Sequence, residues 1–307
     1  MIFEEPTILK VRKHEVFVER KITPVTVMVT GDWHISPIVS EKQLEFLEQA
    51  IEVAKPDLII LQGDIVDSPL ELKRETSVKK LFKELTLCSK AAPTVMVLGT
   101  HDYITPTRIA KSLAGFAIPR MKKICEKCNV TLLFDEFFEL PAIRVFGAFQ
   151  DEKCTLAYRE DGLFSHFDNT YEFERKLSKF DFSDLGEDKI NWFASHAPMI
   201  NEKVAKDLAG FDILSFGHTH GGIVPRGIDD IFDQAGINFG FISPHGTPFN
   251  SLARGMRAVG DGSLMLINAG MAGASFNAPR MLQKMNAVKA AEVSVVEIKN
   301  RPEAETE

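Results

Sequence analysis

Five of the eight histidines in this 307-residue chain follow short apolar runs that predict buried β-strands, and aspartates accompany most of them. In chain order the motifs are Gly31-Asp32-Trp33-His34, Gly63-Asp64-Ile65-Val66-Asp67, Gly99-Thr100-His101-Asp102, the single His196, and Gly217-His218-Thr219-His220. Because loops at the carboxyl ends of successive strands converge on one crevice, we expect these carboxylates and imidazoles to meet. Oxygen and imidazole ligands together suit Mn²⁺, Fe²⁺ or Zn²⁺. The motifs therefore predict a metal centre.

The elements that must position these motifs alternate between strand and helix patterns. Strands are expected at Val25–Thr30, Asp57–Gln62, Thr94–Leu98, Val130–Phe134, Ile143–Phe149, Trp192–Ser195, Phe211–Phe216, Leu264–Asn268 and Val293–Lys299. Amphipathic helices are expected from Ser40 to Pro56, around Leu81–Leu85, from Thr105 onward and around Tyr171–Lys179. This alternation is typical of a layered α/β fold.

The bulk composition narrows the class of protein. With 45% hydrophobic and 26% charged residues, the chain has the composition of a soluble globular protein with a sizeable core. The net charge of −7 argues against a general nucleic-acid binder, so no nucleic-acid partner is expected. An anionic substrate remains compatible with that charge, because bound metals can invert the local field. The sequence carries no apolar run long enough for a transmembrane segment and no secretory signal pattern, so we expect a cytoplasmic location.

The four cysteines allow two interpretations. Cys125-x-x-Cys128 has the spacing of a zinc or redox motif, but Met121, Ile124 and the same two cysteines also form one helical stripe. No second pair of cysteines is present to complete a four-ligand zinc site. We therefore expect buried core thiols.

The chain is expected to form a single domain over residues 1–299, followed by a short acidic C-terminal tail at 300–307. Residues 150–185 and 221–263 contain no motif that we can interpret, and both are expected to shape a substrate pocket. The sequence gives no indication of the oligomeric state.

Taken together, the motifs resemble the calcineurin-like metallophosphoesterase superfamily, whose pattern is D-x-H, G-D-x-x-D, G-N-H-[DE], a separate His and G-H-x-H. The order is the same here, and the match covers roughly residues 25–220. The segment from Leu264 to Gly270, followed by Pro279-Arg280, is similar to the small bacterial phosphoesterases of this superfamily. With the expected layering, the resemblance implies a four-layer αββα sandwich with two mixed β-sheets flanked by helices.

The resemblance also implies two divalent metal ions that share Asp64 as a bridging ligand. The ligands of the first ion would be Asp32, His34 and His220. The ligands of the second would be His196, His218 and residue 100. One departure from the family pattern stands at that last position, where Thr100 replaces the family's Asn. Its shorter hydroxyl could bind directly, through a water, or not at all.

His101 is expected to contact substrate and to protonate the leaving alkoxide, and Asp102 is expected to fix the tautomer and orientation of its ring. Asp67 is expected to support its loop by hydrogen bonds. A metal-bridging hydroxide would then attack a phosphate ester or pyrophosphate, since metal lowers the pKa of bound water to about 7. The expected substrate is a phosphorylated small molecule or a lipid-linked phosphate.

Two other functions stay open at this stage, a nuclease of the same superfamily and a non-catalytic scaffold that retains the fold. Several side chains also have two interpretations each. Trp33 would pack behind the metals or form a wall of the site, and Arg254, Arg257 and Arg280 would lie at the surface or contact phosphate. His245 would line the pocket or lie outside it, and the apolar patch Phe239–Ile242 would be a lipid-facing lip, a dimer contact or part of the core.

Overall fold

In the computed structural model, the described residues are 6–39, 41–106, 110–158, 164–166, 168–222, 224–235, 237, 240–242, 248–250, 253–260, 262–272 and 289–301. The expectations for Ser40, Phe239, His245, Arg280 and most of the C-terminal tail lie outside these residues.

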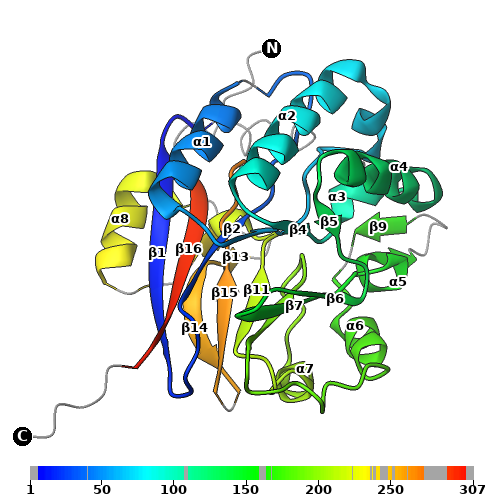
Figure 1. The fold of residues 1–307 in the computed structure, drawn as a ribbon. Helices are drawn as coiled ribbons and strands as arrows, with labels where there is room; N and C mark the ends of the chain where they lie inside the picture. The colour runs from blue at the N-terminus through cyan, green and yellow to red at the C-terminus, as the bar shows by residue number, and fades with distance from the viewer. Residues whose placement is uncertain are drawn as a thin grey trace, which may run out of the picture.

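Two six-stranded mixed sheets form the centre of the molecule (Figure 1). The first has the order β1-β16-β2-β3-β4-β5. Its strands are β1 (Leu9–Val18), β16 (Ala291–Asn300), β2 (Val25–Thr30), β3 (Leu58–Leu61), β4 (Thr94–Met96) and β5 (Thr131–Leu132). From β2 to β5 all neighbours are parallel, which brings the carboxyl ends of β2, β3 and β4 to one edge.

The second sheet has the order β14-β15-β11-β10-β7-β6. Its strands are β14 (Gly255–Val259), β15 (Ser263–Ile267), β11 (Ile213–Phe216), β10 (Ile190–Ala194), β7 (Ile143–Gly147) and β6 (Glu136–Glu139). The four central strands β15, β11, β10 and β7 are parallel, and the two outer pairings are antiparallel. Two short hairpins accompany the sheets, β8 (Leu156–Tyr158) with β9 (Phe164–His166) and β12 (Gly240–Ile242) with β13 (Pro248–Asn250).

The helices enclose the paired sheets from outside. They are α1 (Lys42–Ala54), α2 (Glu75–Ala91), α3 (Thr100–Tyr103), α4 (Ala114–Lys127), α5 (Glu152–Thr155), α6 (Thr170–Leu177), α7 (Glu202–Asp207) and α8 (Arg226–Gln234). The short 3₁₀ turns are η1 (Pro69–Lys73) and η2 (His220–Gly222).

Three hydrophobic clusters fill the spaces between four layers of helices and sheets. One lies between the first sheet and α1, α2 and α4, a second lies between the two sheets, and a third lies between the second sheet and α6 and α7. Trp192 and Leu266 in the second cluster, with Val27 from the opposite sheet, are fully buried. The expected αββα sandwich is confirmed.

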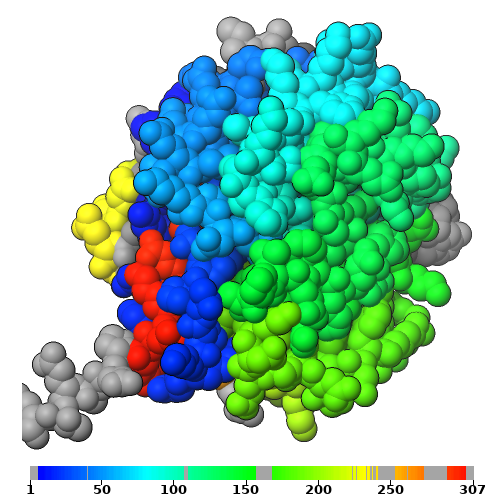
Figure 2. Space-filling model, in the orientation of Figure 1, coloured from blue at the N-terminus to red at the C-terminus, as the bar shows by residue number. Residues whose placement is uncertain are grey.

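The expected strands are present, with ends that differ by a few residues. The sequence analysis missed β1, where charged residues interrupt the apolar positions. Figure 2 shows β1 (blue) and β16 (red) side by side, so two distant segments complete the edge of the first sheet. The helix expected from Thr105 begins only at Ala114, because the Thr105 hydroxyl accepts a hydrogen bond from the Lys111 N–H and its own N–H donates to the Lys111 carbonyl oxygen.

All four cysteines are free and buried, and Cys125 lies in α4 with its sulfur 3.8 Å from that of Met96. Burial raises the pKa of this thiol. The interpretation as core thiols is therefore confirmed. Among the described residues, no helix combines the length and apolar character needed to cross a bilayer.

Candidate metal centre

The motif residues lie in loops and short helical turns at the carboxyl ends of parallel strands from both sheets. They follow β2 (Asp32, His34), β3 (Asp64), β4 (Thr100, His101, Asp102), β10 (His196) and β11 (His218, His220). All are buried except His101, which is half-buried. The two sheets are joined here, since His196 Nδ1 lies 2.7 Å from the carbonyl oxygen of Gln62. Residues separated by almost two hundred positions thus form one site.

The backbone at these loops is unusual. Eight described residues other than glycine have a positive φ, and five of them are motif residues: Asp32, His34, Asp64, His218 and His220. Their φ angles lie between 47° and 70°. For residues with a Cβ atom this conformation costs roughly 1–2 kcal/mol each. Such strain concentrates at functional sites, where the surrounding structure holds it.

The first group consists of Asp32, His34 and His220, whose possible ligand atoms all lie within 4.8 Å of one another. His220 Nε2 is 3.9 Å from Asp32 Oδ1. Within the described part of the chain, Asp32 Oδ1 and His34 Nε2 are buried without a hydrogen-bond partner. Buried polar atoms are almost always satisfied, so the orphaned oxygen and nitrogen fit a cation between them.

The second group consists of Asp64, His196 and His218, again within 4.8 Å. His196 Nε2 lies 3.1 Å from Asp64 Oδ2 and 3.2 Å from His218 Nδ1. The same Asp64 oxygen lies 3.9 Å from His34 Nε2 of the first group. Asp64 therefore stands between the two groups.

Three of these histidines present Nε2 to the site and Nδ1 to an outer oxygen. The Nδ1 atom of His196 contacts the Gln62 carbonyl, that of His220 lies 3.3 Å from the Ala272 carbonyl, and that of His34 lies 3.5 Å from Asp67 Oδ1. The contacts of His196 and His220 are hydrogen bonds, which fix the tautomer of a metal-binding imidazole, whereas that of His34 is at ion-pair distance. Asp67 was expected to support its loop, and its carboxylate also faces a candidate ligand.

The field in the site favours positive charge. Burial lowers the pKa of the His196 imidazole, but the carboxylates of Asp64 and Asp32 outweigh burial and raise this pKa to about 10. Despite its burial, the pKa of Asp64 lies well below the usual range, because His196 and His101 are close. Metal ions can replace the protons that such a field attracts, since ligation requires neutral imidazoles and ionised carboxylates. The donor set fits divalent metals.

His101 lies beside the first group, with its ring centroid 4.6 Å from that of His34. Its main-chain N–H donates to Asp64 Oδ1 at 2.8 Å, and its Nδ1 lies 2.9 Å from the Asp67 carbonyl oxygen. The structure corrects the expected role of Asp102, because the Asp67 carbonyl holds this ring.

The Asp102 carboxylate instead accepts hydrogen bonds from the main-chain N–H groups of Gly99, Ile65 and Val66. Asp102 is the third residue of α3, and its side chain turns back toward the loop after β3. It thereby joins the loops that carry Asp64 and His101. Burial, followed by the charge of Asp64, raises the pKa of Asp102 to about 7.

Thr100 is buried at the first position of α3. The chain passes very close to Asp64 here, because a Cβ atom added to the preceding Gly99 would lie 2.2 Å from Asp64 Oδ1.

Trp33 is fully buried in the cluster under α1 and α2, and its Nε1–H donates to Thr30 Oγ1. Of its two interpretations, packing behind the site is therefore the observed one.

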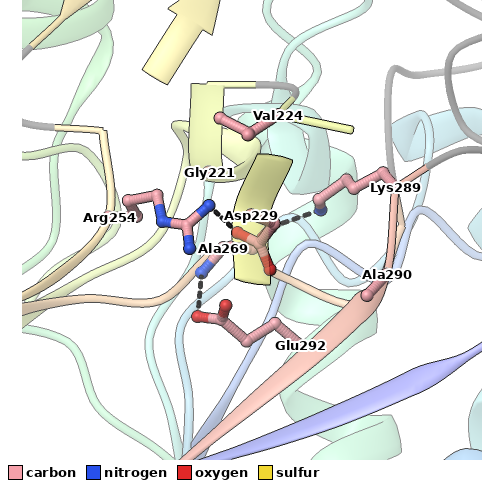
Figure 3. A pocket seen from close by; sticks show the side chains of 8 residues that line it. All are labelled: Gly221, Val224, Asp229, Arg254, Ala269, Lys289, Ala290 and Glu292. Atoms are coloured by element: carbon pink, nitrogen blue, oxygen red, sulfur yellow. Dashed lines mark hydrogen bonds and ion pairs between the residues drawn. The ribbon is translucent and has the colours of Figure 1, made fainter. Parts of the chain in front are cut away.

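A buried network of charges lies behind the first group (Figure 3). Lys289 Nζ donates to the carbonyl oxygens of Ala269, Gly270 and Ala272, at 2.6, 3.2 and 2.8 Å. The Ala272 N–H in turn donates to the Asp32 carbonyl oxygen at 2.9 Å. The ammonium group therefore holds the loop against which both Asp32 and His220 rest.

Carboxylates and guanidinium groups complete this network. Arg254 forms an ion pair with Asp229, and Arg12 donates to Glu292 at 2.9 Å. Burial raises the pKa of Glu292, but the neighbouring Arg12 and Arg254 outweigh burial and lower this pKa to about 2. Arg254 is 2% exposed, so it takes neither of the two expected positions and serves as a buried structural cation.

The sequence analysis missed Lys289, and it also missed Asp168. Asp168 Oδ2 lies 3.4 Å from His218 Nε2. Neither residue belongs to a motif, and each is brought to the site by a long segment that carries no readable periodicity. The apolar strand that follows Lys289 was the one available signal.

Several known proteins are similar to this chain. A family model described as calcineurin-like phosphoesterase matches residues 25–222. An uncharacterized metallophosphoesterase from Aquifex aeolicus is 23% identical over 72% of this chain and 73% of its own length. A component of the nuclease SbcCD from Staphylococcus epidermidis is 30% identical over 24% of this chain and 22% of its own length. A dimetal phosphatase from Danio rerio aligns over 81% of this chain and 88% of its own at 13% identity, with a TM-score of 0.42.

The matched range covers more than half of the chain and contains every motif residue. The chain belongs to the calcineurin-like phosphoesterase family. It is therefore a metallophosphoesterase, a hydrolase of phosphate esters that uses divalent metal ions held by His and Asp residues.

Proposed function

We propose that this protein is a dinuclear phosphohydrolase that cleaves a phosphate ester or a pyrophosphate. The observation that carries the proposal is the position of Asp64, whose Oδ2 atom lies 3.1 Å from His196 Nε2 and 3.9 Å from His34 Nε2. One carboxylate thus faces both groups of ligands. A pair of ions about 3.5–4 Å apart, which clamps the attacking and leaving oxygens of an in-line displacement, needs such a bridge.

The proposed ligand sets follow the two groups. Asp64 would contact both ions. The first ion would bind Asp32, His34 and His220, and the second would bind His196, His218 and, through its hydroxyl, Thr100. When bound, the ions lower the pKa of a shared water toward about 7 and stabilise charge on the phosphoryl oxygens.

His101 is proposed to protonate the leaving oxygen. The Asp67 carbonyl at its Nδ1 can only accept, so Nδ1 carries a proton and Nε2 is the atom that exchanges one with substrate. Burial lowers the pKa of His101 in the free protein. A bound phosphate would raise that pKa, because an opposite charge favours the protonated ring. Substrate binding would then charge the acid where it is needed.

The proposed substrate is a phosphorylated small molecule or a lipid-linked phosphate. The net charge of −7 supports it over nucleic acid, which usually requires a basic surface. The resemblance to a nuclease component over 24% of the chain makes DNA a necessary comparison substrate. The cytoplasmic location, the single domain and metals of the set Mn²⁺, Fe²⁺ and Zn²⁺ stay predictions.

The decisive experiment compares His101→Ala with wild type on p-nitrophenyl phosphate and its bis ester, with Mn²⁺ added. Loss of a general acid should lower the rate by about 10²–10⁴-fold on an ester with a poor leaving group, and by less on these p-nitrophenyl esters, whose leaving group needs little protonation. Elemental analysis should still find two ions per chain. His14→Ala is the matched control, since His14 lies in β1 away from the site.

Three results would contradict the proposal. The first is a wild-type protein that takes up no divalent metal or hydrolyses neither ester, as a scaffold would. The second is full activity of His101→Ala on a substrate with a poor leaving group, which would refute the acid role. The third is hydrolysis of DNA alone with a steep salt dependence of binding, which would identify a nuclease instead.

A further inference from the structure

His218 is oriented differently from the other three candidate ligand histidines. His34, His196 and His220 turn Nδ1 outward, whereas His218 turns Nδ1 toward the site, 3.2 Å from His196 Nε2. The opposite ring nitrogen, Nε2, therefore faces away from the metal positions. An acceptor for the proton on that nitrogen has to come from another part of the chain.

Asp168 lies at this outer nitrogen, with Oδ2 3.4 Å from His218 Nε2. Its side chain is 33% exposed and that of His218 is 10% exposed, so the pair is partly shielded from water. At 3.4 Å the contact is at ion-pair distance and is not a formed hydrogen bond. A carboxylate in this position behind a metal-binding imidazole fixes the ring and makes the inner nitrogen a better electron donor.

The main chain next to Asp168 is held firmly. Asn169 caps α6 by accepting a hydrogen bond from the Glu172 N–H, and its own N–H donates to the Cys154 carbonyl oxygen at 2.7 Å. One turn further, Phe173 is fully buried under the second sheet. The carboxylate is thus presented to His218 by an anchored helix terminus.

We propose that Asp168 is a positioning residue for the second metal ion. It accepts the Nε2 proton of His218 and so keeps Nδ1 unprotonated and directed at the ion. This inference rests on the proposed dinuclear function. It also gives a reason why the second site can function with Thr100 in place of an amide ligand, since a more basic imidazole offsets a weaker oxygen ligand.

The test is a titration of Mn²⁺ into metal-free protein, followed by calorimetry and by the electron paramagnetic resonance signal of the coupled ion pair. Asp168→Ala should weaken binding of the second ion by about 10–100-fold and leave the first ion unchanged. Asp168→Asn keeps an acceptor oxygen but no charge, so its affinity for the second ion should fall less than that of Asp168→Ala. Asp184→Ala removes an exposed carboxylate beyond α6 and is the matched control.

A double-mutant cycle separates positioning from general destabilisation. In a His218→Ala background, Asp168→Ala should have no further effect on the second ion, and the melting temperature of metal-free Asp168→Ala should match that of wild type. Unchanged affinity in Asp168→Ala, equal weakening of both ions, or a full effect without His218 would each overturn the inference. If wild type itself binds fewer than two ions, the proposed dinuclear function fails instead.

Discussion

Buried charges support the first group of ligands from behind, whereas a partly exposed carboxylate borders the second group. Each group contains a histidine whose outer nitrogen faces an aspartate. His34 and Asp67 each have 3% of the side chain exposed, but Asp168 has 33% exposed. Asp67 belongs to the same motif as Asp64, while Asp168 lies in a segment without a motif.

The difference indicates a division of tasks between the two sites. The loop under the first group is fixed by Lys289, which makes three hydrogen bonds to main-chain carbonyls. In our proposal, the second group depends on Asp168 and on Thr100, where the family pattern has Asn. We expect the first ion to be the tightly held one and the second to respond to changes around residues 150–185.

The largest effect is expected from a variant that affects both metal sites equally. Asp64→Asn takes away the carboxylate that faces both groups, so both ions should be lost together and kcat/KM should fall by roughly 10³-fold or more. Elemental analysis and steady-state kinetics measure the two effects. Loss of only one ion would show that Asp64 is not shared.

A second variant should affect the first site selectively. Lys289→Met removes a donor from three buried carbonyls. Gly270 keeps the Glu292 N–H and Ala272 keeps His220 Nδ1, so the Ala269 carbonyl bears most of the loss, and an unsatisfied buried group costs about 1–3 kcal/mol. We therefore expect a loss of about 1–3 kcal/mol in the free energy of unfolding, together with weaker binding of the first ion. Urea unfolding and Mn²⁺ titration check both.

Lys203→Met is the control for that change, because Lys203 forms a surface ion pair with Glu174 and should matter little. If the second ion weakened more than the first in Lys289→Met, the assignment of support to the two groups would be reversed.

The charge network behind the first group should also depend on pH. The pKa of Glu292 is lowered to about 2 in the folded protein, against an ordinary value of 4.5. The unfolded chain therefore takes up this proton first, and the stabilisation present above pH 4.5 is lost as the pH falls toward 2. The stability gap between wild type and Glu292→Gln should narrow by about 2 kcal/mol from about pH 5 to about pH 3.

For Glu84 in α2, we expect the opposite change of stability with pH. Burial raises the pKa of Glu84 to about 8, so its contribution is lost as the pH rises from about 4.5 to 8. Urea unfolding of metal-free Glu84→Gln should show a smaller fall in stability over that range.

For Glu292, the contrary result is a difference in stability between wild type and Glu292→Gln that stays constant as the pH falls. It would mean that the Glu292 carboxylate is not held by its charged partners.

The smallest expected effect strengthens the second site. Thr100→Asn restores the longer amide ligand of the family pattern, so the second ion should bind up to about tenfold more tightly, or ~1.4 kcal/mol. Mn²⁺ titration of the metal-free variant provides the measurement. Unchanged affinity and stoichiometry would show that residue 100 does not reach the ion.

Much of the fold and of the candidate site could be predicted from the sequence, because both depend on local patterns. The run Val25–Thr30 and its following Asp32 are contiguous, so one window reveals the strand and the ligand. Prediction failed where contacts are distant. Asp102 is next to His101 in sequence, but the first turn of α3 directs its carboxylate to the loop after β3.

The sequence by itself determined which side chains are available for metal, their order along the chain and the layered α/β fold, since strand periodicity and motif spacing are short-range properties. Only the tertiary structure decided what lies behind each ligand, as for His218 beside Asp168 and for Asp32 beside the loop under Lys289. Those contacts depend on how two sheets and a long intervening segment pack together, and no local pattern of residues specifies that packing.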